Sequence, residues 1–255
     1  MAYTLQNWNG ININCAHSKG GVLVLSHPFD NLISTNCSPW PSSEILQKLY
    51  QSRQSRAFEG NELVACTSGI GYYCDLQSIH SEDAITWSVF GTVAHSSQET
   101  LEAWLADLFL ILGLQDIQTK NAEIFLWRRI PHPDILVPGG PEIDVGIMTE
   151  NALVLGEAKW QSSTGTRQGK NKDKDQIQLR GEFLAKYGTV LFPRHSHFVV
   201  LGISLYTGAF ADTTPEDVIF RQLTWEEVCS LGTHPLSDEV GRYFEWKEKF
   251  SIANM

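Results

Sequence analysis

Two neighbouring stretches in the middle of the chain have the hydrophobic pattern of paired β-strands. Apolar residues occupy every second position from 143 to 147, and the run 152–158 is largely apolar. The polar segment 149–151 interrupts the pattern and predicts a tight turn centred near Glu150 and Asn151. We therefore expect an antiparallel hairpin in the centre of the fold.

The flanking segments predict helices and further strands in a regular order. Ser81 and Ser96 can each cap a helix, and leucines at 101, 105, 108 and 112 form one apolar side of the second helix. The other expected elements are a strand at 122–130, a helix from Asp173 to Gly188, strands at 197–205 and 218–223, and helices from Thr224 and from Ser237 to Phe250. The order helix, strand, hairpin, helix, strand predicts an α/β fold that buries the hairpin between helices.

The N-terminal part of the chain has a different pattern. Residues 1–75 are rich in Asn, Ser, Gly and Pro, with short apolar runs and one expected helix from Ser43 to Arg53. We expect an N-terminal loop- and strand-rich elaboration at 1–75 and a main domain at 76–255. No chemical motif stands out in the elaboration.

Candidate chemistry lies at the end of the central hairpin. A turn near Glu150 and Asn151 sets Asp144 roughly opposite Gly156 and Glu157, while Glu157 and Lys159 share one strand face. A slip of one residue in the turn would send Asp144 to the other face. Buried charges require partners or a metal, and Mg²⁺ accepts carboxylate oxygens while it keeps positions for water and phosphate. The pattern favours metal-assisted phosphodiester hydrolysis over a surface ion pair, which is the simpler alternative.

These residues resemble a known signature. The sequence Pro141-Glu142-Ile143-Asp144, followed after a spacer by Glu157-Ala158-Lys159, is similar to the motif of the PD-(D/E)xK nuclease superfamily. A literal Pro133-Asp134 lies upstream, but Pro138-Gly139-Gly140 intervenes and makes it a poorer hairpin partner. The resemblance implies a restriction-endonuclease-like core with a central mixed β-sheet flanked by helices. It also implies a deoxyribonuclease, of the endonuclease type and active in restriction or defence, that depends on Mg²⁺ or on Mn²⁺ in its place.

The resemblance assigns roles to two residues on helices. Glu82 matches the helix acid that many members contribute to the metal, although an acid in a first helical turn also complements the helix dipole. Glu99 and Glu102 on the next helix compete for that role, and Glu99 fits a capping box with Ser96. Gln176 matches a glutamine that positions the metal water or the phosphate, and a capping box with Asp173 is its alternative.

Basic residues follow the signature and suggest a nucleic-acid contact. Arg180 lies one turn after Gln176, where its guanidinium could bind a phosphate. Between Arg167 and Lys186 there are six basic and three acidic residues. We expect DNA to dock on this segment, with RNA not excluded, although solvated loop charge would give the same pattern. The candidate residues for this contact are Arg167, Lys170, Lys172, Lys174 and Arg180.

The composition limits the class of protein. A net charge of −10 makes the chain as a whole repel nucleic acid and argues against a nuclease unless the local charge differs. The five cysteines are odd in number and lack zinc spacing, so we expect reduced thiols and a cytoplasmic protein. The N-terminus lacks a secretory signal pattern. A homodimer is expected only by analogy, because a double-strand break usually needs two active sites.

Two other functions remain open at this point. A non-catalytic DNA-binding or assembly module of the same fold would agree with the acidic net charge. Hydrolysis by paired carboxylates, as in glycosidases, would leave Lys159 and the basic segment without a role. Serine-nucleophile and phosphate-loop chemistries are not indicated, because neither G-x-S-x-G nor GxxxxGK[ST] occurs.

Overall fold

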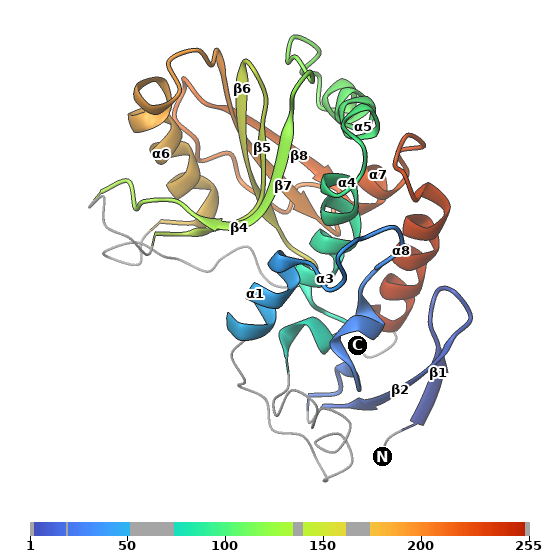
Figure 1. The fold of residues 1–255 in the computed structure, drawn as a ribbon. Coiled ribbons are helices and arrows are strands. Elements are labelled where there is room, and N and C mark those ends of the chain that lie inside the picture. The colour runs from blue at the N-terminus through green and yellow to red at the C-terminus, as the bar shows by residue number, and fades with distance from the viewer. Residues whose placement is uncertain (1–2, 19, 52–73, 135–139, 162–173, 253–255) are drawn as a thin grey trace. The chain divides into compact units, whose positions relative to one another are not determined.

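The computed structural model describes residues 3–18, 20–51, 74–134, 140–161 and 174–252 (Figure 1). The chain divides into two compact units, one formed by residues 1–95 with 236–255 and the other by residues 96–235. The boundary predicted near residue 75 falls next to a segment outside the described residues and stays a prediction. Each unit is described by itself.

The first unit contains a small antiparallel sheet and several helices. Strands β1 (Tyr3–Gln6), β2 (Asn12–His17) and β3 (Leu23–Leu25) pair in that order. The predicted helix at Ser43 is confirmed as α1 (Ser43–Gln51), and the last residues predicted for it lie outside the described residues. The remaining elements are η1 (Pro28–Asn31), η2 (Asp75–Gln77), α3 (Glu82–Thr86), η3 (Trp87–Gly91), α4 (Thr92–Ala94) and α8 (Ser237–Ile252).

The segment from α3 to α4 is helical throughout, but it is not one regular α-helix. Ser81 caps it as predicted, since its side chain accepts a hydrogen bond from the Ala84 amide. Residues 87–91 form a π-helical turn. The indole of Trp87 lies against Gly91, where a Cβ atom would be 2.4 Å from the ring. The sequence periodicity does not distinguish this widened turn from a regular α-helix.

The second unit is built on a five-stranded mixed sheet, which confirms the predicted α/β class. The strands are β4 (Glu123–Arg129), β5 (Glu142–Met148), β6 (Ala152–Ala158), β7 (His197–Ser204) and β8 (Ile219–Thr224), paired in chain order. The pairings of β4 with β5 and of β5 with β6 are antiparallel, and the other two are parallel. Figure 1 shows α6 (Gln176–Leu191) on one side of the sheet, with α5 (Gln98–Ile111) and α7 (Trp225–Cys229) on the other.

The hairpin forms in the predicted register. Val145 lies opposite Gly156, and the turn closes with a 2.9 Å hydrogen bond from the Thr149 amide to the Ala152 carbonyl. Continued by one residue, this register sets Asp144 opposite Glu157 on the same face of the sheet. All seven residues of β6 are buried, as expected for a central strand covered on both faces.

An apolar cluster fixes α6 on the sheet face that carries Glu157. Leu153 and Leu155 of β6 pack there with Phe183 and Leu184 of the helix. The helix begins after the cap residue Asp175 rather than at Asp173, which lies outside the described residues. The prediction that the helix stops at Gly188 is wrong. A Cβ atom at Gly188 would lie 2.8 Å from the Phe198 ring, so this glycine permits close packing rather than ending the helix.

Within the described part of the chain, no helix combines the length and the apolar composition needed to cross a lipid bilayer.

Gly156 is expected to be intolerant of a side chain, because a Cβ atom there would lie 2.4 Å from Val145 Cγ1 and 2.9 Å from the Val145 carbonyl oxygen. We predict that Gly156→Ala lowers the free energy of unfolding by about 2 kcal/mol, the usual cost of overpacking a core. Chemical denaturation measures this change. Gly232→Ala is the matched control, since nothing lies within 4 Å of its added Cβ. Equal stability of the two variants would contradict the packing described for the hairpin.

Candidate active site

Asp144 is held at the end of the hairpin by the neighbouring strand. Its side chain is half-buried, and its Oδ2 atom accepts a 2.8 Å hydrogen bond from the Ala158 amide. Among the described residues, nothing hydrogen-bonds or ion-pairs with the Oδ1 atom of Asp144. One carboxylate oxygen is therefore fixed by the backbone while the other is available to a ligand.

Glu157 is the most deeply buried carboxyl group of the site, with 1% of its surface exposed. Its Oε1 atom lies 2.6 Å from Lys159 Nζ, and its Oε2 atom contacts Arg180 Nη2. Lys159 also hydrogen-bonds this carboxylate, so each of the two oxygens has a cation beside it. The predicted proximity of Glu157 and Lys159 is confirmed by this contact.

Arg180 is fixed in place from α6 and has no exposed surface. Nη1 donates to the Gln176 carbonyl at 2.9 Å, and Nη2 donates to the Glu142 carbonyl at 2.7 Å. Both amino groups therefore bind backbone oxygens while the guanidinium faces Glu157. The structure places Arg180 beneath the carboxylates rather than on a surface that could receive DNA, so its predicted contact with phosphate stays a prediction that this geometry does not favour.

The surroundings of Glu157 disfavour its charged form. Burial raises the pKa of Glu157 to about 8, Arg180 opposes the shift, the nearby charge of Asp144 adds to it and Lys159 opposes it. A divalent cation at this carboxyl group would favour the ionised form, so metal binding would release a proton.

Trp127 marks a local kink in β4 beside the site. Leu126 pairs with Val145 and Arg128 pairs with Ile143, so Trp127 occupies the position opposite Asp144. Its backbone adopts a φ of 54°, which is rare for a bulky side chain, and the regular pairing skips this residue. Such strained backbone conformations occur preferentially at functional sites. The kink therefore lies opposite Asp144, at a position without a regular pair between β4 and β5.

The structure places the two predicted helix residues in different units. Gln176 is the first residue of α6, partly exposed, and its carbonyl accepts from Arg180. This contact puts the first turn of α6 at the end of the sheet that carries Glu157. Glu82 is the first residue of α3 in the other unit, where its charge acts on the buried Lys247 of α8. Its role as a metal ligand stays a prediction.

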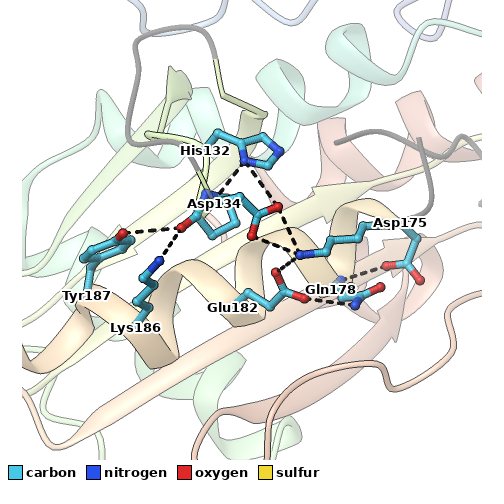
Figure 2. A network of polar contacts seen from close by, with 9 residues as sticks. His132, Asp134, Asp175, Gln178, Glu182, Lys186 and Tyr187 are labelled. Carbon is cyan, nitrogen blue, oxygen red and sulfur yellow. Dashed lines mark hydrogen bonds and ion pairs between the residues drawn. The ribbon is translucent and has the colours of Figure 1, made fainter. Parts of the chain in front are cut away.

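Lys174 makes internal contacts rather than facing solvent alone. Its Nζ atom lies 2.6 Å from Glu182 Oε2 and 3.2 Å from both carboxylate oxygens of Asp134 (Figure 2). Glu182 Oε1 also accepts from Gln178 Nε2 at 2.9 Å. The lysine therefore links α6 to the segment that follows β4, and its predicted contact with nucleic acid would have to compete with these ion pairs.

The same segment is held at a second point along α6. The Pro133 carbonyl accepts from Lys186 Nζ at 2.9 Å and from the Tyr187 hydroxyl at 3.3 Å (Figure 2). Asp134 also donates its amide to His132 Nδ1 at 3.2 Å. The literal Pro133-Asp134 pair is thus anchored on the helix. Asp144 is the aspartate that lies across from Glu157.

Several candidate residues lie outside the described part of the chain, namely Arg167, Lys170 and Lys172. Within the part that is described, no group of three or more Asp, Glu, His or Cys side chains is arranged to hold a metal ion. Glu102 and Glu99, the alternatives to Glu82, have other surroundings. Glu102 accepts from Gln98 and from the Asn121 amide, and Glu99 is exposed in the first turn of α5, which Ser97 caps instead of Ser96.

The donor set nevertheless fits one hard divalent cation in its chemistry. Asp144 offers a carboxylate oxygen without a partner among the described residues, and Glu157 offers a buried carboxylate whose Oε1 atom it shares with Lys159. Mg²⁺ needs only one or two protein carboxylates, because water and substrate phosphate complete its octahedron. Lys159, with 13% of its side chain exposed, supplies a positive charge next to these oxygens.

Sequence reasoning missed the positions of Arg180 and Trp127. Arg180 lies three residues after Ile177 and four before Leu184, so the apolar periodicity of the helix already contained its position. That spacing could have indicated burial. The kink at Trp127 has no comparable signal, since neither glycine nor proline marks it.

Comparison of the chain with protein-family models, with curated proteins and with solved structures gave no match. The assignment of a function therefore depends on the geometry of the site.

Glu157 should make the stability of the protein depend on pH. Because its pKa is raised in the folded state, the contribution of Glu157 is fully present below its ordinary pKa of 4.5 and is lost as the pH rises toward 8. We predict that, without metal, the free energy of unfolding of the native chain relative to Glu157→Gln falls between pH 5 and pH 8. Denaturation curves at several pH values measure this difference. A difference that rises with pH in this window would show that Arg180 and Lys159 lower the pKa of Glu157 by more than burial raises it.

The pair Lys174–Glu182 should contribute to stability through a direct interaction. We predict a coupling free energy of about 0.5–1 kcal/mol in a double-mutant cycle of Lys174→Met and Glu182→Gln, as for partly buried ion pairs. The exposed pair Arg128–Glu123, 3.2 Å apart, is the control and should couple less strongly. A coupling of zero would show that the contact between Lys174 and Glu182 does not contribute to stability.

Proposed function

We propose that this protein is a Mg²⁺-dependent deoxyribonuclease of the PD-(D/E)xK type, acting as an endonuclease in restriction or defence. The element order supports this proposal. Helix α5, strand β4, hairpin β5–β6, helix α6 and strand β7 follow one another as in the core that the sequence motif implies. Asp144 and Glu157 fall on the adjacent strands β5 and β6 of the mixed sheet, Lys159 directly follows β6, and helices flank both faces of the sheet (Figure 1).

The observation that carries the proposal is the buried contact between Glu157 and Lys159 directly across from Asp144. Two acids and an amine on one face of an apolar hairpin are costly to bury even when they are paired, and a ligand would give a reason for that cost. The hairpin register, the 2.6 Å contact and the hydrogen bond from the Ala158 amide bring the three side chains together. A catalytic role explains the proximity of these three side chains better than chance does.

Each residue has a distinct role in the proposed reaction. Asp144 and Glu157 hold the metal through carboxylate oxygens, and the bound ion supplies Lewis-acid stabilisation of charge on the scissile phosphate. Lys159 orients the attacking water or stabilises negative charge that develops on a phosphate oxygen. Gln176, the first residue of α6, would steady the water or the phosphate. Mn²⁺ should replace Mg²⁺ in this site.

Cleavage of plasmid and linear DNA in the presence of Mg²⁺ tests the proposal. Addition of EDTA and the substitution Lys159→Ala should each lower the cleavage rate by about a hundredfold or more, as expected for loss of a group that acts in the transition state. Lys120→Ala is the control, since Lys120 is exposed in the same unit and has no role in the site. Equal rates in all samples would contradict the mechanism. RNA is assayed in parallel to decide between the two nucleic acids.

A non-catalytic module of the same fold is the second candidate. The specific observation in its favour is that two basic residues expected to contact phosphate, Lys174 and Arg180, are engaged inside the protein. The net charge of −10 agrees with this alternative. Binding of Mn²⁺ without cleavage of any nucleic acid would favour the module over the enzyme. The free thiols of Cys15, Cys37, Cys74 and Cys229 agree with the cytoplasmic setting that we propose for either function.

A further inference from the structure

The candidate site contains two basic side chains, Arg180 and Lys159, which differ in burial. Arg180 is anchored by two backbone carbonyls and has no exposed surface. Lys159 retains 13% exposure of its side chain and sits at the open end of β6. The arginine is therefore fully buried and bound to the backbone, whereas part of the lysine side chain is exposed.

The oxygens of the two acids are divided among different partners. Asp144 Oδ2 is used by the Ala158 amide, and Glu157 Oε2 faces Arg180. The remaining oxygens are Asp144 Oδ1, which accepts nothing from the described residues, and Glu157 Oε1, which contacts Lys159. No third acid, histidine or cysteine of the described chain joins them in a metal-binding group. One oxygen from each acid, that of Glu157 shared with Lys159, can hold one divalent ion whose other positions water and phosphate fill.

We propose that Arg180 serves as the internal second cation of this site and limits it to a single divalent ion held by Asp144 and Glu157. The inference rests on the function proposed above and makes it more specific. Arg180 is a positioning residue, because it acts through Glu157 and does not itself touch the substrate. It keeps Glu157 Oε2 occupied, and its charge repels a second ion from the same carboxylate.

Binding of Mn²⁺ to the full chain, followed by the electron paramagnetic resonance signal of free Mn²⁺, tests the inference without any assay of activity. The expected stoichiometry of the native chain is one ion. A stoichiometry of two would overturn the inference whatever the behaviour of the variants. Binding of no ion would overturn both the inference and the proposed function.

The variant Arg180→Met removes the charge while it keeps an unbranched side chain. If Arg180 acts as a cation, Mn²⁺ should bind this variant about tenfold more tightly, because a neighbouring positive charge is lost. Arg180→Lys retains the charge and should bind Mn²⁺ within about threefold of the native chain. Arg221→Met is the control and should leave the affinity unchanged, since the hydrogen bonds of Arg221 within the described residues go to the carbonyls of Leu112 and Phe220.

A merely structural role of Arg180 predicts the opposite direction. Loss of the arginine would then disorder Glu157 and weaken Mn²⁺ binding in Arg180→Met, and this result in a folded variant would overturn the inference. Circular dichroism checks that the variant is folded. If Arg180→Met does not fold, the number of Mn²⁺ ions bound by the native chain tests the inference on its own. DNA cleavage is measured separately. One bound ion with tighter binding in Arg180→Met but no cleavage would support the inference and contradict the proposed nuclease.

Discussion

The site depends on the burial of one carboxyl group. Glu157 lies on a strand whose residues are all buried, so its charge cannot be hydrated and must be balanced by neighbouring groups. Arg180 approaches one oxygen from the helix, and Lys159 approaches the other from the same strand. The sheet, the helix and the hairpin turn all serve this arrangement, because a change in any of them would leave a charge buried without a partner.

The geometry follows from two restraints that act on different elements. The turn at Thr149 sets the hairpin register and places Asp144 beside Glu157. The apolar cluster of Leu155 and Phe183 fixes α6 on the sheet and delivers Arg180 to the same carboxylate. Packing alone would tolerate several sliding positions of a helix on a sheet. The carbonyl of Glu142, bound by Arg180, adds a directional contact that selects one of them.

Much of the fold could be predicted because its signals are local. The alternation of apolar residues gave the hairpin, and the cap residues Ser81 and Thr224 gave the starts of two helices. The pairing of Asp144 with Glu157 followed from a single turn. The burial of Arg180 and the backbone of Trp127 could not be predicted with the same ease, because both depend on contacts between elements far apart in the sequence.

Charge balance reconciles the acidic net charge of the protein with the phosphate substrate that we propose. The two acids of the site are matched by Lys159 and Arg180, so the four groups in their charged forms carry no net charge. A divalent ion would therefore make the site positive, despite a net charge of −10 for the chain. Because Arg180 is buried and Lys174 is engaged with Glu182, the metal would provide much of the attraction for phosphate. Affinity for DNA in such a protein should then depend on the metal as well as on surface lysines.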